Sequence, residues 1–274
     1  MARDKLPIVV SIATIPSRIG HIRATLDSLL EGDLKPDQIL VTHPEFCNWE
    51  NSGYDIPAFL EDESYCRGIV KVALAARDWG PGTKLLGAID HIPDECYLVL
   101  ADDDVAYDRR FLHGLIEAQS ENHDSSFSYY TYRAGGLKFG QGCDGYSFYT
   151  PNLAGVYKFA EQHVAETTLL YHDDLWIGFF LFKKGVKVRR LANPEDGELV
   201  YQQLLPNDVL SSKTSGELAR DQIYHDHLER LIRDAELPKH RMVTLRARQL
   251  RDYTASKLSR IVQKFNRRIA ESKT

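Results

Sequence analysis

The stretch YLVLADDDVAY, residues 97 to 107, joins a run of apolar, strand-forming residues to three consecutive carboxylates. The length and composition of the run predict a buried β-strand over residues 97–101. Asp102, Asp103 and Asp104 follow at the point where the strand leaves the core, and adjacent like charges repel one another. A divalent cation is a common way to compensate such a cluster. Taken alone, the cluster is also compatible with a turn or a helix cap.

The sequence on both sides of this stretch alternates strand-length apolar runs with helical patterns. Such alternation is typical of an α/β domain built on a largely parallel sheet. The glycine-rich segment GGLKFGQGCDGYSFYTP predicts turns and a hairpin, and VKVRRL predicts a return to the sheet. HDDLWIGFFLFKKG predicts a helix that is capped by Asp173 or Asp174 and closed by Gly185. The remaining strands are expected at 8–13, 38–42, 69–75 and 127–132, and the remaining helices at 21–30 and 108–119.

Polar residues follow three of the predicted strands. In an open α/β sheet, ligands bind beyond the carboxyl ends of the strands. The first strand ends in TIPSR, the third in ARDWGPGTK and the fourth in ADDDV. These segments supply side chains suited to a phosphorylated ligand, namely Thr14, Arg18, Asp78, Lys84 and the three aspartates. We therefore expect one site at this edge of the sheet.

The order of these segments resembles a known family. Strand, TIPSR, helix, two strands, D-x-G-P-x-T-K, strand, D-x-D and a later HDDLW occur in that order, over roughly residues 6 to 235. In this order the chain resembles glycosyltransferases of the GT-A fold, in particular small inverting enzymes of family 2 type from bacterial and large-virus polysaccharide pathways. The resemblance implies an α/β fold of the Rossmann-like nucleotide-diphospho-sugar transferase type. Its mixed, mostly parallel sheet would be flanked by helices, with a helical C-terminal extension.

The resemblance also implies an activity. The chain would be a metal-dependent inverting transferase of hexosyl or deoxyhexosyl type, with Mn²⁺ or Mg²⁺ as cofactor. It would move a sugar from a nucleotide-diphosphate donor, with UDP as the default, to a hydroxyl of a glycan or lipid-linked saccharide. The metal would neutralise the departing diphosphate.

The family pattern assigns roles to the aspartates after the fourth strand. Asp104 would bind the metal directly, and Asp102 would contact the ribose or the water shell of the metal. Asp103 is the variable middle position on the donor side, where Thr14, Arg18, Asp78 and Lys84 would also lie.

The acidic pair about 70 residues after D-x-D would supply the base. An inverting transfer needs a carboxylate that takes the proton from the acceptor hydroxyl. By the match to the second member of the pair, Asp174 would be that base, with Asp173 as the alternative. Trp176 would stack on the acceptor sugar unless it belongs to the core, and the aromatic stretch 146–157 would help to shape the acceptor side.

Two other functions compete with this reading. GPGTKLLGAI imitates the glycine-rich signature of sugar-phosphate nucleotidyltransferases, but that signature belongs after the first strand and here follows the third. A non-catalytic sugar-binding or scaffold protein on the same fold would lack turnover, whereas both the aspartate cluster and the acidic pair are present here. A competent transferase releases nucleotide diphosphate slowly without acceptor, and a scaffold should release none.

Composition indicates an ordinary globular protein. The 274 residues are 43% hydrophobic, enough for one large domain with an appendage. The four cysteines show no CxxC spacing, and no apolar run approaches the roughly 20 residues that a membrane span needs. We expect a cytoplasmic protein, with peripheral attachment to the inner face of the membrane left open. The predicted divisions are a catalytic domain over 1–210, a helical segment packed on it over 211–237 and a basic amphipathic helical tail over 238–274.

The charge of the chain is divided unevenly. Residues 238–274 carry 11 Lys and Arg against 2 Asp and Glu, which gives this segment a charge of +9. Because the whole chain has a net charge of −5, the rest of the chain has a charge of −14. An acidic body argues against nucleic acid as a partner. The tail places apolar residues from Leu250 to Ile269 along one helical stripe. Such a helix suits an anionic membrane surface, a partner subunit or the acidic body, and the sequence does not choose among them.

Overall fold

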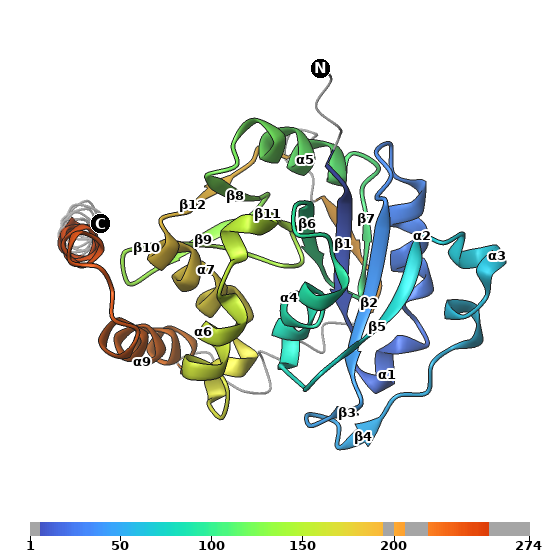
Figure 1. Ribbon diagram of the computed structural model, residues 1–274, viewed down its shortest axis with the longest axis horizontal. Helices are drawn as coiled ribbons and strands as arrows, with labels where there is room; N and C mark the ends of the chain where they lie inside the picture. The colour runs from blue at the N-terminus through green and yellow to red at the C-terminus, as the bar shows by residue number, and fades with distance from the viewer. Residues whose placement is uncertain (1–5, 194–199, 206–218, 252–274) are drawn as a thin grey trace, which may run out of the picture.

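The computed structural model describes residues 6–193, 200–205 and 219–251, and Figure 1 shows their arrangement. A seven-stranded sheet in the order β12-β8-β11-β6-β1-β2-β5 forms its centre. Strand β11 runs antiparallel to both of its neighbours, and every other pair in the sheet is parallel. The strands are β1 (Ile8–Ala13), β2 (Gln38–Pro44), β5 (Val70–Ala75), β6 (Tyr97–Ala101), β8 (Ser125–Ser128), β11 (Tyr146–Tyr149) and β12 (Lys187–Arg190).

Helices cover both faces of the sheet (Figure 1), and short two-stranded sheets lie outside it. The helices are α1 (Pro16–Ile19), α2 (Arg23–Glu31), α3 (Glu63–Cys66), α4 (Thr83–Leu86), α5 (Phe111–Glu121), α6 (Val156–His163), α7 (Asp173–Lys184) and α9 (Ala219–Asp234). The small sheets pair β3 (Phe46–Cys47) with β4 (Ser52–Gly53), β7 (Val105–Tyr107) with β13 (Tyr201–Gln203), and β9 (Thr131–Ala134) with β10 (Leu137–Gly140).

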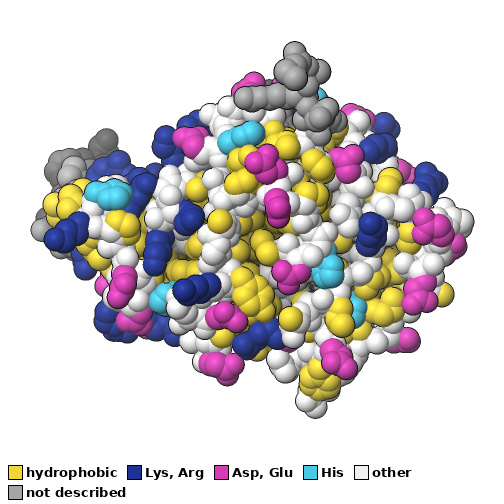
Figure 2. Space-filling view, viewed as in Figure 1, with side chains coloured by type: hydrophobic (Ala, Val, Ile, Leu, Met, Phe, Trp, Pro, Cys, Tyr) yellow, Lys and Arg dark blue, Asp and Glu magenta, His cyan; other side chains and the backbone are white. Residues whose placement is uncertain are grey.

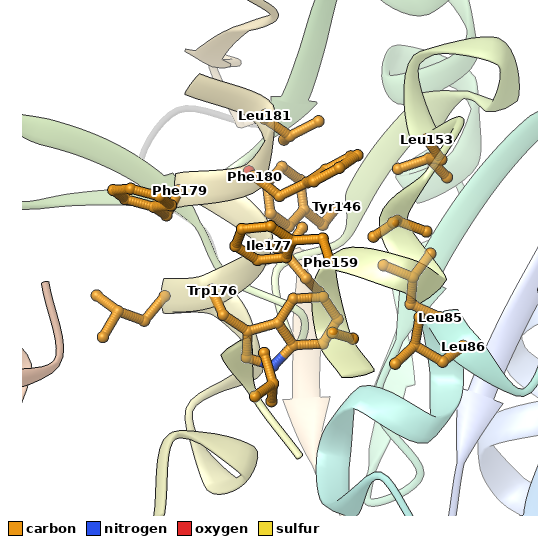
Figure 3. Close-up of a cluster of buried hydrophobic side chains, with 14 of the residues drawn as sticks. Leu85, Leu86, Tyr146, Leu153, Phe159, Trp176, Ile177, Phe179, Phe180 and Leu181 are labelled. Atoms are coloured by element: carbon orange, nitrogen blue, oxygen red, sulfur yellow. The ribbon is translucent and has the colours of Figure 1, made fainter. Parts of the chain in front are cut away.

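Two hydrophobic clusters hold the helices on the sheet. Because side chains alternate between the faces of a strand, Leu98 and Leu100 of β6 join the cluster under α4, α6 and α7. Tyr97 and Val99 of the same strand join the cluster under α2 and α5. Figure 3 shows part of the first cluster, in which the aromatic side chains of α7 pack against α4 and α6. Full burial on both faces explains why β6 reads as a continuous apolar run.

The strand order creates a crevice at the carboxyl end of β1. The chain proceeds from β1 outward to β2 and β5, and then returns to place β6 on the other side of β1. Ligands bind at such a switch point in open α/β sheets. The polar segments that follow β1, β5 and β6 are therefore brought together at one edge, as the sequence predicts.

Most of the expected elements are confirmed, with three differences. The expected strand at 127–132 is split between β8 and β9 by a bend at Tyr129 and Tyr130. The segment expected to hold only turns and a hairpin contains β10, which forms a hairpin with β9. It also contains β11, which lies inside the main sheet. Helix α7 ends at Gly185 in the left-handed conformation (φ 91°), as expected. Its N-cap, however, is His172 without a side-chain cap, so the expectation that an aspartate caps it was wrong.

The C-terminal part of the chain is helical where it is described. Helix α9 lies against the body and contacts both α7 and β9. A further helix follows Pro238 over residues 239–251. The expected boundary at residue 210 and the tail beyond residue 251 lie outside the described residues. Across the described ranges, no helix combines the length and apolar character that crossing a membrane requires.

Candidate active site

A cleft of about 330 Å³ opens at the crevice beside β1 and β6. It brings together every predicted donor-side, metal and base residue, which are Thr14, Arg18, Asp78, Lys84, Asp102, Asp103, Asp104, Asp173 and Asp174. These residues come from segments up to 160 positions apart in the chain. Their meeting follows from the strand order and from the packing of α7 beside β10 and α4.

Asp103, the middle aspartate, links the loop after β6 to the segment that follows β1. Its side chain is buried, accepts a hydrogen bond from the Thr14 hydroxyl at 2.7 Å and lies 3.1 Å from the Arg18 guanidinium. Its backbone carbonyl accepts a hydrogen bond from the Thr25 hydroxyl at 3.0 Å. Burial raises the pKa of Asp103 to about 6, although Arg18 and Thr14 oppose the rise. Asp103 therefore fixes the loop that carries its two neighbours.

Asp102 and Asp104 face the cleft on either side of Asp103. Their side chains are 31% and 19% exposed, respectively. Asp104 lies 3.2 Å from the Arg18 guanidinium, and its pKa is raised by burial and by the charge of Asp102. The backbone N–H of Asp102 donates to the hydroxyl of Tyr107 at 2.8 Å. Both carboxylates remain within reach of a ligand in the cleft.

Lys84 links the aspartates after β6 to the start of α7. Its buried ammonium donates to Asp102 Oδ1 at 2.7 Å and lies 3.2 Å from Asp173 Oδ2. The contact with Asp173 is an ion pair without hydrogen-bond geometry, which leaves Asp173 Oδ2 without a hydrogen-bond partner. Burial lowers the pKa of Lys84, but Asp102 and Asp173 outweigh burial and hold it well above its ordinary value. Lys84 is therefore a permanent cation between the two acidic groups.

Asp174 lies beside this ion-pair chain and is more exposed than Asp173. Its Oδ1 accepts a hydrogen bond from the backbone N–H of Gly142 at 3.1 Å. Burial and the adjacent charge of Asp173 raise the pKa of Asp174 well above its ordinary value, against the lowering effect of Lys84. A raised pKa makes a carboxylate a better proton acceptor at neutral pH. Asp174 can therefore accept a proton from a ligand in the cleft more readily than an ordinary aspartate, whereas Asp173 is engaged with Lys84.

Gly142 occupies a position where a side chain would not fit. A Cβ atom there would lie 2.6 Å from Lys84 Nζ and 3.2 Å from Asp102 Oδ1. The loop can approach the ion pair and donate to Asp174 only because residue 142 has no side chain. The glycine-rich stretch was predicted as turns, and this contact gives one of its glycines a role in the cleft.

The fit of the implied divalent metal can be judged from the lining of the cleft. The lining contains six aspartates against one arginine and one lysine, so acidic charge is in excess. In the part of the chain that the structure describes, no group of three or more His, Cys, Asp or Glu side chains is arranged to hold a metal. Mg²⁺ is often held by one or two carboxylates together with substrate phosphates. Asp102 and Asp104 fit that donor set, with a phosphorylated ligand completing it.

The structure corrects the expectation for Trp176. Its side chain is fully buried among the aromatic residues of α7 and the leucines of α4, as Figure 3 shows, and it does not line the cleft. A Cβ on Gly82 would lie 2.7 Å from the Trp176 ring, which shows how closely the loop before α4 packs on it. Trp176 packs beneath the loop before α4, and its buried ring is not accessible for stacking on a sugar. Tyr146 is likewise fully buried rather than part of an acceptor surface.

The cleft also contains residues that the sequence analysis missed. Aromatic side chains line it from four separate segments, and these are Trp49, Tyr54, Tyr171, Tyr201 and Tyr224. Tyr201 reaches the cleft because β13 pairs with β7, directly after the three aspartates. Tyr224 belongs to α9, whose polar sequence gave no sign of a site. Isolated aromatic residues of this kind carry no local signal in the sequence, so only the folded chain could reveal them.

Comparisons with known proteins find similarity in structure but not in sequence. Neither a protein-family model nor a curated protein matches this sequence. Among solved structures, the mannosyltransferase PcManGT from Pyrobaculum calidifontis, in complex with GDP-Man and Mn²⁺, is similar with a TM-score of 0.57 and 14% identity. The match covers 90% of this chain and 70% of that one.

Weaker matches are to S. aureus TarS. One structure gives a TM-score of 0.49 at 14% identity over 86% of this chain and 44% of that one. A complex of a TarS fragment with UDP gives 0.46 at 16% identity over 83% and 72% of the two chains. The likeness to PcManGT and the mainly parallel sheet confirm that this chain has a GT-A-like glycosyltransferase fold.

Proposed function

We propose that this chain is a metal-dependent, inverting glycosyltransferase that moves a sugar from a nucleotide-diphosphate donor to a hydroxyl of a saccharide. One observation carries the proposal. The three aspartates after β6 and the acidic pair at the start of α7 line the same cleft, with Lys84 between them. A turn or a helix cap would give no reason for that meeting.

The donor side of the cleft would use the residues around β1 and β6. Asp104 and Asp102 would hold the metal, which when bound neutralises charge on the leaving diphosphate. Thr14, Arg18 and Asp78 lie in the same lining and would position the donor. Asp103 would keep Arg18 and the aspartate loop in place through the contacts described above.

The acceptor side would use the start of α7. Asp174 would take the proton from the acceptor hydroxyl as the new bond forms on the face opposite the leaving group. The Gly142 N–H fixes the orientation of its Oδ1. Asp173 would hold Lys84 in place rather than act as base.

A thermal-shift screen of UDP, GDP, dTDP and CMP, each with and without Mn²⁺, tests the donor site. A ligand that binds only the native state raises its melting temperature. We expect a metal-dependent rise with one nucleotide in the wild-type chain and none in Asp104→Asn. No rise with any nucleotide would refute the proposed donor site. An equal rise in Asp104→Asn would refute the role of Asp104.

Release of nucleotide diphosphate without acceptor separates a transferase from a scaffold. A transferase should hydrolyse the donor slowly, and a scaffold on this fold should not.

The tail over 238–274 is proposed to contact an anionic membrane surface, which would suit a lipid-linked acceptor. Its excess of positive charge supports that part of the proposal.

A further inference from the structure

A second hollow, of about 720 Å³, adjoins the cleft. The two share Gln141, Tyr201 and Tyr224 in their linings. A third hollow of about 600 Å³ shares Arg133 and His225 with the second and reaches Gln249 on the helix at 239–251. Because neighbouring hollows share lining residues, we treat the three as one trough, which follows the β9–β10 hairpin and α9 away from the cleft.

Tyrosines are frequent among the residues that line the second hollow, namely Tyr130, Tyr132, Tyr201 and Tyr224. Tyr130 is 44% exposed and has the Arg190 guanidinium 5.9 Å from its ring centre. The rings of Tyr132 and Tyr224 lie 5.9 Å apart, and the Tyr132 ring stacks on Phe139 of β10 at 5.3 Å. The ring of Tyr224 also meets that of His172, the residue before the acidic pair, at 5.2 Å. The aromatic contacts thus continue to the residue that precedes the acidic pair.

Polar side chains lie between these rings. Gln141, Asp144 and Arg133 are among the lining residues of the hollow, so its lining includes an amide-bearing, an acidic and a basic residue. Such a mixture of flat aromatic faces and a few directional polar groups suits a ligand that is itself apolar on its faces and rich in hydroxyls at its edges. A pyranose ring has this character. A lipid tail would leave the polar groups unpaired, and burying such groups without partners is costly.

We propose that the trough binds an extended saccharide, longer than a single sugar residue, whose end enters the cleft beside Asp174. The inference rests on the proposed function and identifies its acceptor as a saccharide chain held by α9 and the β9–β10 hairpin. Two observations support an extended ligand. The hollow next to the cleft lies within the size range of pockets for complete small-molecule ligands, and a further hollow continues from it.

Saturation-transfer difference NMR on the full chain, without nucleotide, tests this inference. The probes are three series of oligosaccharides, built from glucose, mannose or N-acetylglucosamine and one to four residues long. Because stacking on aromatic rings tolerates variation in the sugar, we expect at least one series to bind with an affinity that rises with length. No binding in any series, or equal affinity of the monosaccharide and the longer members, would overturn the inference.

Matched variants locate the binding. Tyr130→Ala removes an exposed ring from the trough and should weaken binding by roughly three- to tenfold. Tyr65→Ala removes a tyrosine from α3, at the opposite end of the molecule in Figure 1, and should leave binding unchanged. Equal loss in both variants, or none in Tyr130→Ala, would refute the location. The nucleotide thermal shift in the same samples is independent, so failure of the trough leaves the donor site standing, and failure of the donor site is seen separately.

Discussion

Lys84 is the side chain on which both acidic groups of the cleft depend. It is buried between Asp102 and Asp173, each within 3.2 Å of its ammonium. Removing one member of a buried ion pair costs about 3 to 5 kcal/mol because the other charge is left uncompensated. A single residue thus couples the loop after β6 to the first turn of α7.

At the scale of one residue, the raised pKa of Asp174 leads to a prediction about how transfer depends on pH. As a base, Asp174 must be ionised, so transfer should fall as pH drops through its pKa. Since burial and Asp173 raise that pKa, the acid limb of kcat should lie above the range of an ordinary aspartate. Asp173→Asn removes the neighbouring negative charge, which should move the limb to lower pH. Asp174→Asn should abolish transfer and keep the metal-dependent thermal shift.

The same pair of variants distinguishes the two candidate bases. If Asp173 were the base, Asp173→Asn would lose transfer and Asp174→Asn would retain it. The nucleotide-dependent thermal shift, measured over the same pH range, is the control. It reports loss of donor binding at low pH, which could otherwise imitate the titration of a base.

The loop before β11 positions the cleft at the scale of a structural element, and Gly142→Ala tests it. The added Cβ would lie 2.6 Å from Lys84 Nζ, so the loop or the ion pair must move. We expect a fall in transfer of at least tenfold, measured as kcat/KM, together with a loss of stability in urea. Gly20→Ala is the matched control, because its helical φ of −66° and open surroundings accept a methyl group. Equal effects in both variants would contradict a special role for residue 142.

A second prediction at the scale of a structural element concerns how the helix over residues 239–251 stabilises the body. Leu245 is fully buried against the body, whereas Leu250, five residues later, is 65% exposed. Leu245→Ala should lower the free energy of unfolding by about 3 kcal/mol, and Leu250→Ala should change it by less than about 0.5 kcal/mol. Urea denaturation of both variants measures the difference. A negligible effect of Leu245→Ala would mean that this helix does not stabilise the body.

The elements that the sequence predicted well are those with a strong local signal. β1 and β6 were placed to the residue because each is a largely apolar run that ends at polar residues. β11 was missed because its tyrosines and serine follow a glycine-rich stretch, and only pairing with β6 and β8 makes it a strand. One member of the acidic pair was also expected to cap α7, but the N-cap is His172, and Asp173 pairs with Lys84, 89 positions away in the chain. Long-range pairing carries no local pattern, which explains both errors and the tyrosines missed in the trough.

At the scale of the whole molecule, the helix over residues 239–251 stands out by its charge, because it carries five Lys and Arg and no Asp or Glu. Figure 2 shows Lys and Arg side chains gathered over the C-terminal helices. The helix over 239–251 packs on the body through Leu245 and through Arg241 and Arg248, whose guanidinium groups lie 5.9 and 5.6 Å from the ring centre of Phe182. The first part of the tail therefore packs on the body, but it does so through residues outside the predicted apolar stripe. Leu250 of that stripe is exposed, and the rest of the stripe lies outside the described residues.

The opposite face of this helix leads to the last prediction. Val243 and Leu250 are 70% and 65% exposed, and Arg246 lies between them on the same face. Because an apolar stripe with flanking cations binds anionic lipid surfaces, the full chain should co-sediment with phosphatidylglycerol vesicles more than with phosphatidylcholine vesicles, and salt should reduce this binding. A chain ending at Pro238 should lose it. Since that truncation also removes Leu245, a Val243→Asp, Leu250→Asp double variant, which keeps the buried contact, should weaken vesicle binding as well. Undiminished binding by the truncated chain would show that the body, rather than the tail, meets the lipid.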